Sequence, residues 1–232
     1  MFVPYTNIKG KMEENKATVS SSTTTVDEYR RRYYDYELAL DNQLKAYEGE
    51  VCEGFQDDTV LSIRPLQGAL GWFVEFFGAK NEWFSNRPPF PHPLINKASQ
   101  IDSLKPEISK GELFRVGLEQ MRDFAKEVGG KIPVGTLDLQ SPIDLASMLM
   151  DYTNLIYLMM DDPAKAHGFL KMITEVLIES LYLMKKEMVS DWPLSQFPWW
   201  VPRGVFMSDD LMSTLSPELY AEFGKPYNEI IG

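Results

Sequence analysis

The second half of the chain alternates helical segments with short apolar runs, and this order limits the folds that the chain can adopt. Apolar side chains recur at spacings of three and four over residues 110–128, which predicts an amphipathic helix that ends at Gly129-Gly130. The expected elements, in chain order, are a helix at 110–128, a strand at 132–137, helices from Ser141-Pro142 and Asp162-Pro163, a strand at 205–207 and a helix from Ser216-Pro217. Strands that alternate with helices favour a parallel sheet with helices packed outside it.

Three of the expected helices begin with the same local signal, a polar residue followed by proline. Ser141, Asp162 and Ser216 can each accept hydrogen bonds from the free N–H groups of a first turn. Proline suits the first helical position because its missing N–H would have no partner there. Asp144 lies in the first turn after Ser141, where its charge faces the positive end of the helix dipole.

The first half of the chain is less regular. Its pattern predicts a helix from Asp27 to about Gly49, and the three arginines at 30–32 fit a solvated face of that helix better than a basic patch, since acidic residues flank them. Three further segments are expected to be a short buried strand at 60–66, a buried aromatic segment at 72–78 and a proline-rich surface or pocket loop at 86–93.

Composition narrows the class of protein. The 23 Lys and Arg residues against 34 Asp and Glu give a formal net charge of −11, so broad binding to nucleic acid or to anionic membranes is not expected. The single cysteine, Cys52, rules out a disulfide framework within the chain and fits a reducing compartment. The chain has neither a signal-peptide pattern nor an apolar run of about 20 residues. We therefore expect a cytoplasmic protein.

The opening segment differs from the rest in composition. Residues 1–26 include an unbroken run of hydroxyl residues at 20–25 and show no apolar stripe. We expect a disordered or extended tail at 1–26 and one folded domain at 27–232.

Polar residues at the ends of the expected strands are the candidate site, because function gathers there in parallel α/β folds. The candidates for substrate binding are Arg64, Gln67, Asp138, Gln140, Arg203 and, in the proline-rich loop, His92. The catalytic candidates are Asp209 and Asp210, since two adjacent carboxylates can orient a polar substrate or shuttle a proton. An acidic turn that caps the helix at Ser216 is the alternative interpretation, and the residue types leave both open.

No metal site is expected from these residues. Cys52, His92 and His167 are far apart in the chain, and none has a second His or Cys at ligand spacing.

Three motifs follow one another in the second half of the chain. They are Ser141-Pro142-Ile143-Asp144-Leu145-Ala146, then Met160-Asp161-Asp162-Pro163, then Ser208-Asp209-Asp210 with Leu215-Ser216-Pro217-Glu218-Leu219-Tyr220, Phe223 and Pro226-Tyr227. In order and spacing they resemble the uroporphyrinogen decarboxylase superfamily, in which Thr is usual at the position of Asp144. The likeness extends more weakly back to about Asp57 and so covers most of the chain.

The resemblance implies a TIM-type (β/α)8 barrel with its site at the carboxyl ends of the strands. A full barrel has about 250 residues, and the zinc ligands of the methyltransferase branch, a His-x-Cys and a later Cys, lie beyond the Pro-Tyr helix. We therefore expect the N-terminal two-thirds of a barrel, incomplete at its C-terminus. Either the chain is truncated, or a second polypeptide completes the barrel, or the fold closes differently.

The resemblance also bears on activity. Decarboxylases of the family carry Arg-Gln-Ala-Gly-Arg and an early Ser-Asp-Ile, whereas this chain reads Leu61-Ser62-Ile63-Arg64-Pro65-Leu66 at its first strand. The resemblance favours a corrinoid-linked zinc methyltransferase, acting with a small molecule or a corrinoid protein, once complete. Zinc and a corrinoid are the expected cofactors of the complete enzyme. The isolated chain is expected to bind no zinc and to have no activity. The alternatives are a porphyrinogen decarboxylase of tetrapyrrole biosynthesis and a non-catalytic barrel module.

Overall fold

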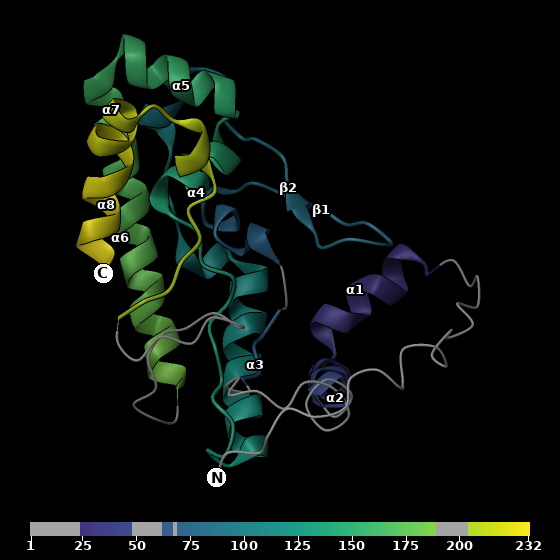
Figure 1. Cartoon of the computed structure of the whole chain (residues 1–232). Helices are drawn as coiled ribbons and strands as arrows, with labels where there is room; N and C mark the ends of the chain where they lie inside the picture. The colour runs from purple at the N-terminus through teal and green to yellow at the C-terminus, as the bar shows by residue number, and fades with distance from the viewer. Residues whose placement is uncertain (1–23, 48–61, 67–68, 189–203) are drawn as a thin grey trace, which may run out of the picture.

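The structure is a computed structural model that describes residues 24–47, 62–66, 69–188 and 204–232 (Figure 1). Its α-helices and strands are α1 (Val26–Tyr34), α2 (Tyr36–Tyr47), β1 (Asn81–Glu82), β2 (Phe90–Pro91), α3 (Glu112–Val128), α4 (Pro142–Leu149), α5 (Tyr152–Asp161), α6 (Pro163–Glu187), α7 (Pro217–Leu219) and α8 (Lys225–Ile231). None of the helices in the described ranges is long and apolar enough to cross a bilayer.

The helices of the second half begin and end where their local signals predict. Ser141 accepts a hydrogen bond from the Asp144 N–H at the start of α4, and Asp162 accepts one from the Lys165 N–H at the start of α6. At the end of α3, Gly129 takes the left-handed conformation with φ 56°, which a residue without a Cβ adopts without strain. The predicted helices at 110–128 and from Asp162 are confirmed within two residues.

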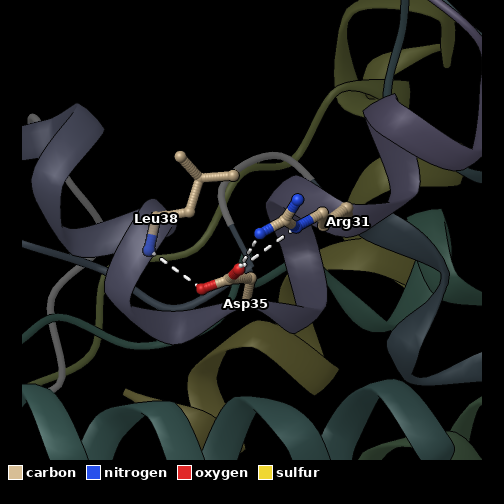
Figure 2. A network of polar contacts seen from close by, with 3 residues as sticks. All are labelled: Arg31, Asp35 and Leu38. Atoms are coloured by element: carbon tan, nitrogen blue, oxygen red, sulfur yellow. Dashed lines mark hydrogen bonds and ion pairs between the residues drawn. The ribbon is translucent and has the colours of Figure 1, made fainter.

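The predicted single helix from Asp27 to Gly49 is wrong, because the chain breaks at Asp35 (Figure 2). The Asp35 carboxylate lies 3.1 Å from the Leu38 N–H, so it caps α2, and 3.1 Å from the Arg31 guanidinium near the end of α1. The backbone of Asp35 is extended, with φ −87° and ψ 100°. A side chain that caps the next helix therefore separates two helices that share one apolar pattern.

Two further helices differ from their predictions. The helix from Ser141 ends at Leu149, and Asp151 caps a separate helix, α5. The helix from Ser216 is divided by a π-helical turn at Tyr220–Gly224 into α7 and α8. Such boundaries depend on contacts with the rest of the fold, which local periodicity does not report.

The predicted parallel sheet is present in part. Its segments pair through isolated parallel bridges, Ile63 with Val134 and Gln140 with Ser208, while the only regular strands of the described residues are the short antiparallel pair β1 and β2. The Ile63 N–H donates to Pro133 O, and the Ser208 N–H donates to Leu139 O. The three segments at 62–64, 133–140 and 205–208 thus run parallel in chain order with helices between them, as in a (β/α) barrel, but a complete barrel is not seen.

The helices form an outer layer on the paired segments. In Figure 1, α3 stands between the α1–α2 pair on one side and α6 with α8 on the other. The aromatic segment at 72–78 is buried, as predicted, and forms 3-10 turns: Trp72 stacks on Phe114 of α3 with 5.3 Å between ring centroids. Gly117 brings α3 so close to Leu137 that a Cβ there would lie 2.8 Å from the leucine methyl groups. This packing fixes the central segment that carries the candidate site.

Candidate functional site

The candidate site begins at the carboxyl end of segment 133–140. The Trp72 indole N–H donates to the Asp138 carbonyl oxygen at 2.7 Å, which fixes this backbone against the aromatic core. Two residues later, the Gln140 side-chain amide donates to Asp138 Oδ1 at 3.1 Å. Asp138 and Gln140, both predicted as site residues, therefore lie next to each other at the strand end.

Asp209 lies at the end of the neighbouring segment and is held by two elements. Ser141 Oγ donates to Asp209 Oδ1 at 3.2 Å, and the Asn228 amide of α8 donates to Asp209 Oδ2 at 2.7 Å. The same Asn228 amide lies 3.3 Å from the Tyr220 hydroxyl. The carboxylate is thus oriented through both oxygens, and it joins α4 to α8.

Asp144 lies beneath the Asp209–Asp210 turn. Its carboxylate accepts the backbone N–H of Asp210 at 2.8 Å and that of Leu211 at 2.9 Å, one on each oxygen. Only 3% of this residue is exposed. Burial raises the pKa of Asp144 from an ordinary value near 3.8 to about 6. The two N–H bonds act in the opposite direction and lower the pKa, while the charge of Asp209 adds a smaller upward effect.

Two buried amide oxygens in this region accept no hydrogen bond from the described residues, Gln140 Oε1 and Asn228 Oδ1. In each amide the nitrogen already donates to a carboxylate, which fixes the orientation of the group. A buried acceptor without a partner costs about 1–3 kcal/mol. Both oxygens are therefore suited to accept N–H or O–H groups of a bound molecule. We call the set Asp138, Gln140, Ser141, Asp144, Asp209, Asp210 and Asn228 the strand-end cluster.

The structure does not bring all predicted site residues together. Arg64 lies in the wall of a cavity that α1 and α2 also line. The described residues that line this cavity include no member of the strand-end cluster. His92 is exposed on the hairpin of β1 and β2, 2.8 Å from Glu82 Oε2. Gln67 and Arg203 lie outside the described residues. Which of these side chains acts on a substrate stays a prediction.

The sequence did not predict three members of the cluster as site residues: Ser141, Asp144 and Asn228. Ser141 and Asp144 were assigned to the start of a helix, where Ser141 is the cap and Asp144 lies in the first turn, but their oxygens also reach residues about 67 positions later in the chain. The one available signal was the aspartate at position 144, where the resembled family usually has threonine. Asn228 carried no signal.

The described residues do not fit a zinc site. They contain no group of three or more His, Cys, Asp and Glu side chains that could hold a metal ion. His167 of α6 stacks on Phe223 with 4.7 Å between centroids and bonds the Tyr227 hydroxyl at 2.8 Å, so its Nδ1 is already engaged. Cys52 lies outside the described residues.

A family model identifies the family to which the chain belongs. The family model described as uroporphyrinogen decarboxylase (URO-D) matches residues 72–188, half of the chain, and this range includes α3 to α6 and the first part of the strand-end cluster. The chain belongs to the uroporphyrinogen decarboxylase family. No curated protein matches the chain.

Solved structures support the same fold. A methyltransferase from Methanosarcina mazei superposes with a TM-score of 0.63 at 17% sequence identity, over 84% of this chain and 52% of the methyltransferase. At this identity the similarity shows the fold alone. The chain spans about half of the length of that methyltransferase. The predicted family is confirmed by the family model over residues 72–188.

Proposed function

We propose that this uroporphyrinogen decarboxylase-family chain forms part of a (β/α)8-barrel methyltransferase that moves a methyl group between a corrinoid and a thiol or methylated small molecule. The observation that carries the proposal is the chemistry of the strand-end cluster. Its side chains are carboxylates, amides and a hydroxyl, and the two groups that lack a partner among the described residues are both acceptors.

The two enzyme alternatives differ in the groups that their large ligands present. A corrinoid carries carboxamide side chains, which donate N–H groups to carboxylates and amide oxygens. A porphyrinogen carries carboxylates, which need cationic partners and are repelled by Asp138, Asp209 and Asp210. Acceptors alone do not separate the two ligands, because the pyrrole N–H groups of a porphyrinogen also donate to carboxylates. Repulsion between the aspartates and the porphyrinogen carboxylates is what favours the corrinoid ligand.

Five residues of the cluster have a role in this proposal. Asp210 is the most exposed of the carboxylates and accepts the proton that a thiol loses as its sulfur becomes the nucleophile. Asp209, fixed by Ser141 and Asn228, and Gln140, through its unpartnered oxygen, orient ligand donors. Because the described residues do not fit zinc, we derive no step through a metal; ligands for zinc would have to come from other residues of the complete enzyme.

Direct binding tests the proposal with the chain as it is. Purified chain is titrated with methylcobalamin and, separately, with uroporphyrin, and the absorbance change gives each dissociation constant. We expect micromolar binding of methylcobalamin and none of uroporphyrin. Asp209→Asn should weaken methylcobalamin binding several-fold, because Asp209 orients ligand donors, whereas Asp151→Asn, at an exposed cap of α5, should not.

The other outcomes each have a meaning. Tighter binding of uroporphyrin refutes the methyltransferase assignment and favours porphyrinogen decarboxylation. Binding of neither ligand favours a barrel module without a catalytic role. In a complete enzyme, Asp209→Asn and Asp210→Asn should both lower turnover while they change stability by less than about 1 kcal/mol.

A further inference from the structure

We infer that the chain has a second ligand site, a cavity between the α1–α2 pair and segment 62–66 that binds a small amphipathic anion. The cavity measures about 780 Å³, a volume that accommodates a metabolite-sized ligand. It is lined by Tyr29, Arg32, Tyr33, Leu38, Ala39, Asn42, Gln43, Arg64, Leu66 and Pro88. The inference does not rest on the proposed methyl transfer.

Charge is the first argument. Two arginines line the cavity, Arg32 from α1 and Arg64 from the end of segment 62–64, and the described lining residues include no Asp or Glu. The chain as a whole carries a net charge of −11. Guanidinium groups bind carboxylate and phosphate through paired hydrogen bonds, and two of them line this one cavity.

Tyr33 lines the same cavity as the two arginines. Burial raises the pKa of the Tyr33 hydroxyl, and the charges of Arg64 and Arg32 both act on it in the opposite direction. Arg32 also lies over the Tyr29 ring, 5.4 Å from its centroid. An oxyanion bound here would meet cationic groups from two elements that are 32 positions apart in the chain.

The two arginines that precede Arg32 in α1 make other contacts and do not line the cavity. Arg31 turns away to Asp35, as Figure 2 shows. Arg30 lies over the rings of Tyr34 and Trp83, at 5.1 and 5.2 Å from their centroids. Of three consecutive arginines only Arg32 lines the cavity, so the run is not a general basic patch.

Two buried glutamines fix the cavity wall. The Gln43 amide, 8% exposed, accepts the Arg64 N–H at 2.9 Å and donates to the Arg64 carbonyl at 3.0 Å. Gln120 of α3, 2% exposed, accepts the Leu66 N–H at 3.0 Å and donates to the Tyr33 carbonyl. Leu66 has φ 43°, a left-handed conformation that is costly for a leucine and is held by this bond. The wall is thus preorganised before a ligand arrives.

The remaining lining residues define the rest of the ligand. Leu38, Ala39, Leu66 and Pro88 provide an apolar surface. The ligand therefore joins a carboxylate or phosphate group to an apolar body.

Isothermal titration calorimetry with three probes that share one apolar body tests the site: 1-naphthyl phosphate, 1-naphthoate and 1-naphthalenemethanol. We expect both anions to bind in the micromolar range and the alcohol at least tenfold more weakly. The tighter of the two anions identifies the source of the ligand as a phosphate ester or a carboxylic acid. Arg32→Gln and Arg64→Gln should each weaken anion binding about tenfold or more, since each removes a charge-assisted hydrogen bond.

Arg30→Gln is the matched control, because it removes the same charge from the same helix outside the cavity lining. Arg32 is exposed, so its replacement leaves the fold intact, which thermal unfolding followed by circular dichroism checks. Equal binding of the alcohol, equal loss in Arg30→Gln, or no anion binding below millimolar concentration would each overturn the inference. Methylcobalamin binding should be unchanged in Arg32→Gln, which separates this site from the strand-end cluster.

Discussion

Replacing Asp144 by asparagine should change how the stability of the chain depends on pH. The folded chain holds the Asp144 carboxyl with a pKa of about 6 because the group is buried, whereas the ordinary value is near 3.8. Because the folded pKa is the higher one, the folded chain keeps the proton to a higher pH than the unfolded chain. The contribution of Asp144 to the free energy of unfolding is therefore greatest below about pH 4, falls between about pH 4 and pH 6, and stays low above that.

The magnitude follows from the two pKa values. A difference of about two pH units corresponds to about 3 kcal/mol, at 1.36 kcal/mol for each unit. Asparagine does not titrate, so the Asp144→Asn variant lacks this decline. The free energy of unfolding of the variant, minus that of the natural chain, should rise by about 2 kcal/mol from pH 4 to pH 7, because part of the full change already lies below pH 4. At pH 4 the variant should be the less stable chain, because the asparagine nitrogen cannot accept one of the N–H bonds from Asp210 and Leu211.

Urea unfolding followed by circular dichroism at pH 4, 5, 6 and 7 measures this difference, and other carboxylates contribute equally to both chains. Asp151→Asn is the control for loss of one carboxylate, because Asp151 caps α5 from an exposed position. A difference for Asp144→Asn that stays constant within about 0.5 kcal/mol over this range would refute the assignment of a buried, raised carboxyl.

Further predictions concern packing and metal. Gly117→Ala should lower the free energy of unfolding, measured in urea, by about 1–2 kcal/mol, because the new Cβ would lie 2.8 Å from the Leu137 methyl groups. In Gly168→Ala of α6 the new Cβ meets nothing within 4 Å, so this variant should raise the free energy of unfolding by up to about 1 kcal/mol. Trp72→Phe should lower it by about 2–3 kcal/mol, since the Asp138 carbonyl loses its indole partner at 2.7 Å in a fully buried position; no loss would mean that this bond does not fix the strand end. Dialysis against zinc followed by elemental analysis should find less than one zinc per chain, and a tightly held zinc lost in Cys52→Ser or His92→Ala would contradict this.

Local chemistry determined the helices of the second half. Ser141-Pro142 and Asp162-Pro163 predict helix starts because capping and the missing proline N–H act over three or four residues, and both starts are observed. The order of motifs likewise sufficed to predict the family. The strand-end residues Asp138, Gln140 and Asp209 could be named from the rule that parallel strands gather polar groups at one edge, and the structure places them in one cluster.

The tertiary structure alone decided which residues meet. The break at Asp35 is different, because its bonds to Leu38 and Arg31 are local, and an apolar pattern that runs from Asp27 to Gly49 simply does not report a cap. Asp144 faces its own helix dipole in the sequence, yet its carboxylate is buried in the fold, where it accepts N–H groups from residues 66 and 67 positions later. Burial raises its pKa, and the two N–H bonds act against that rise. Arg32 and Arg64 enter one cavity only because Gln43 and Gln120 fix two distant segments against each other. Burial and long-range hydrogen bonds set the energies of these groups, and neither is a property of a short stretch of sequence.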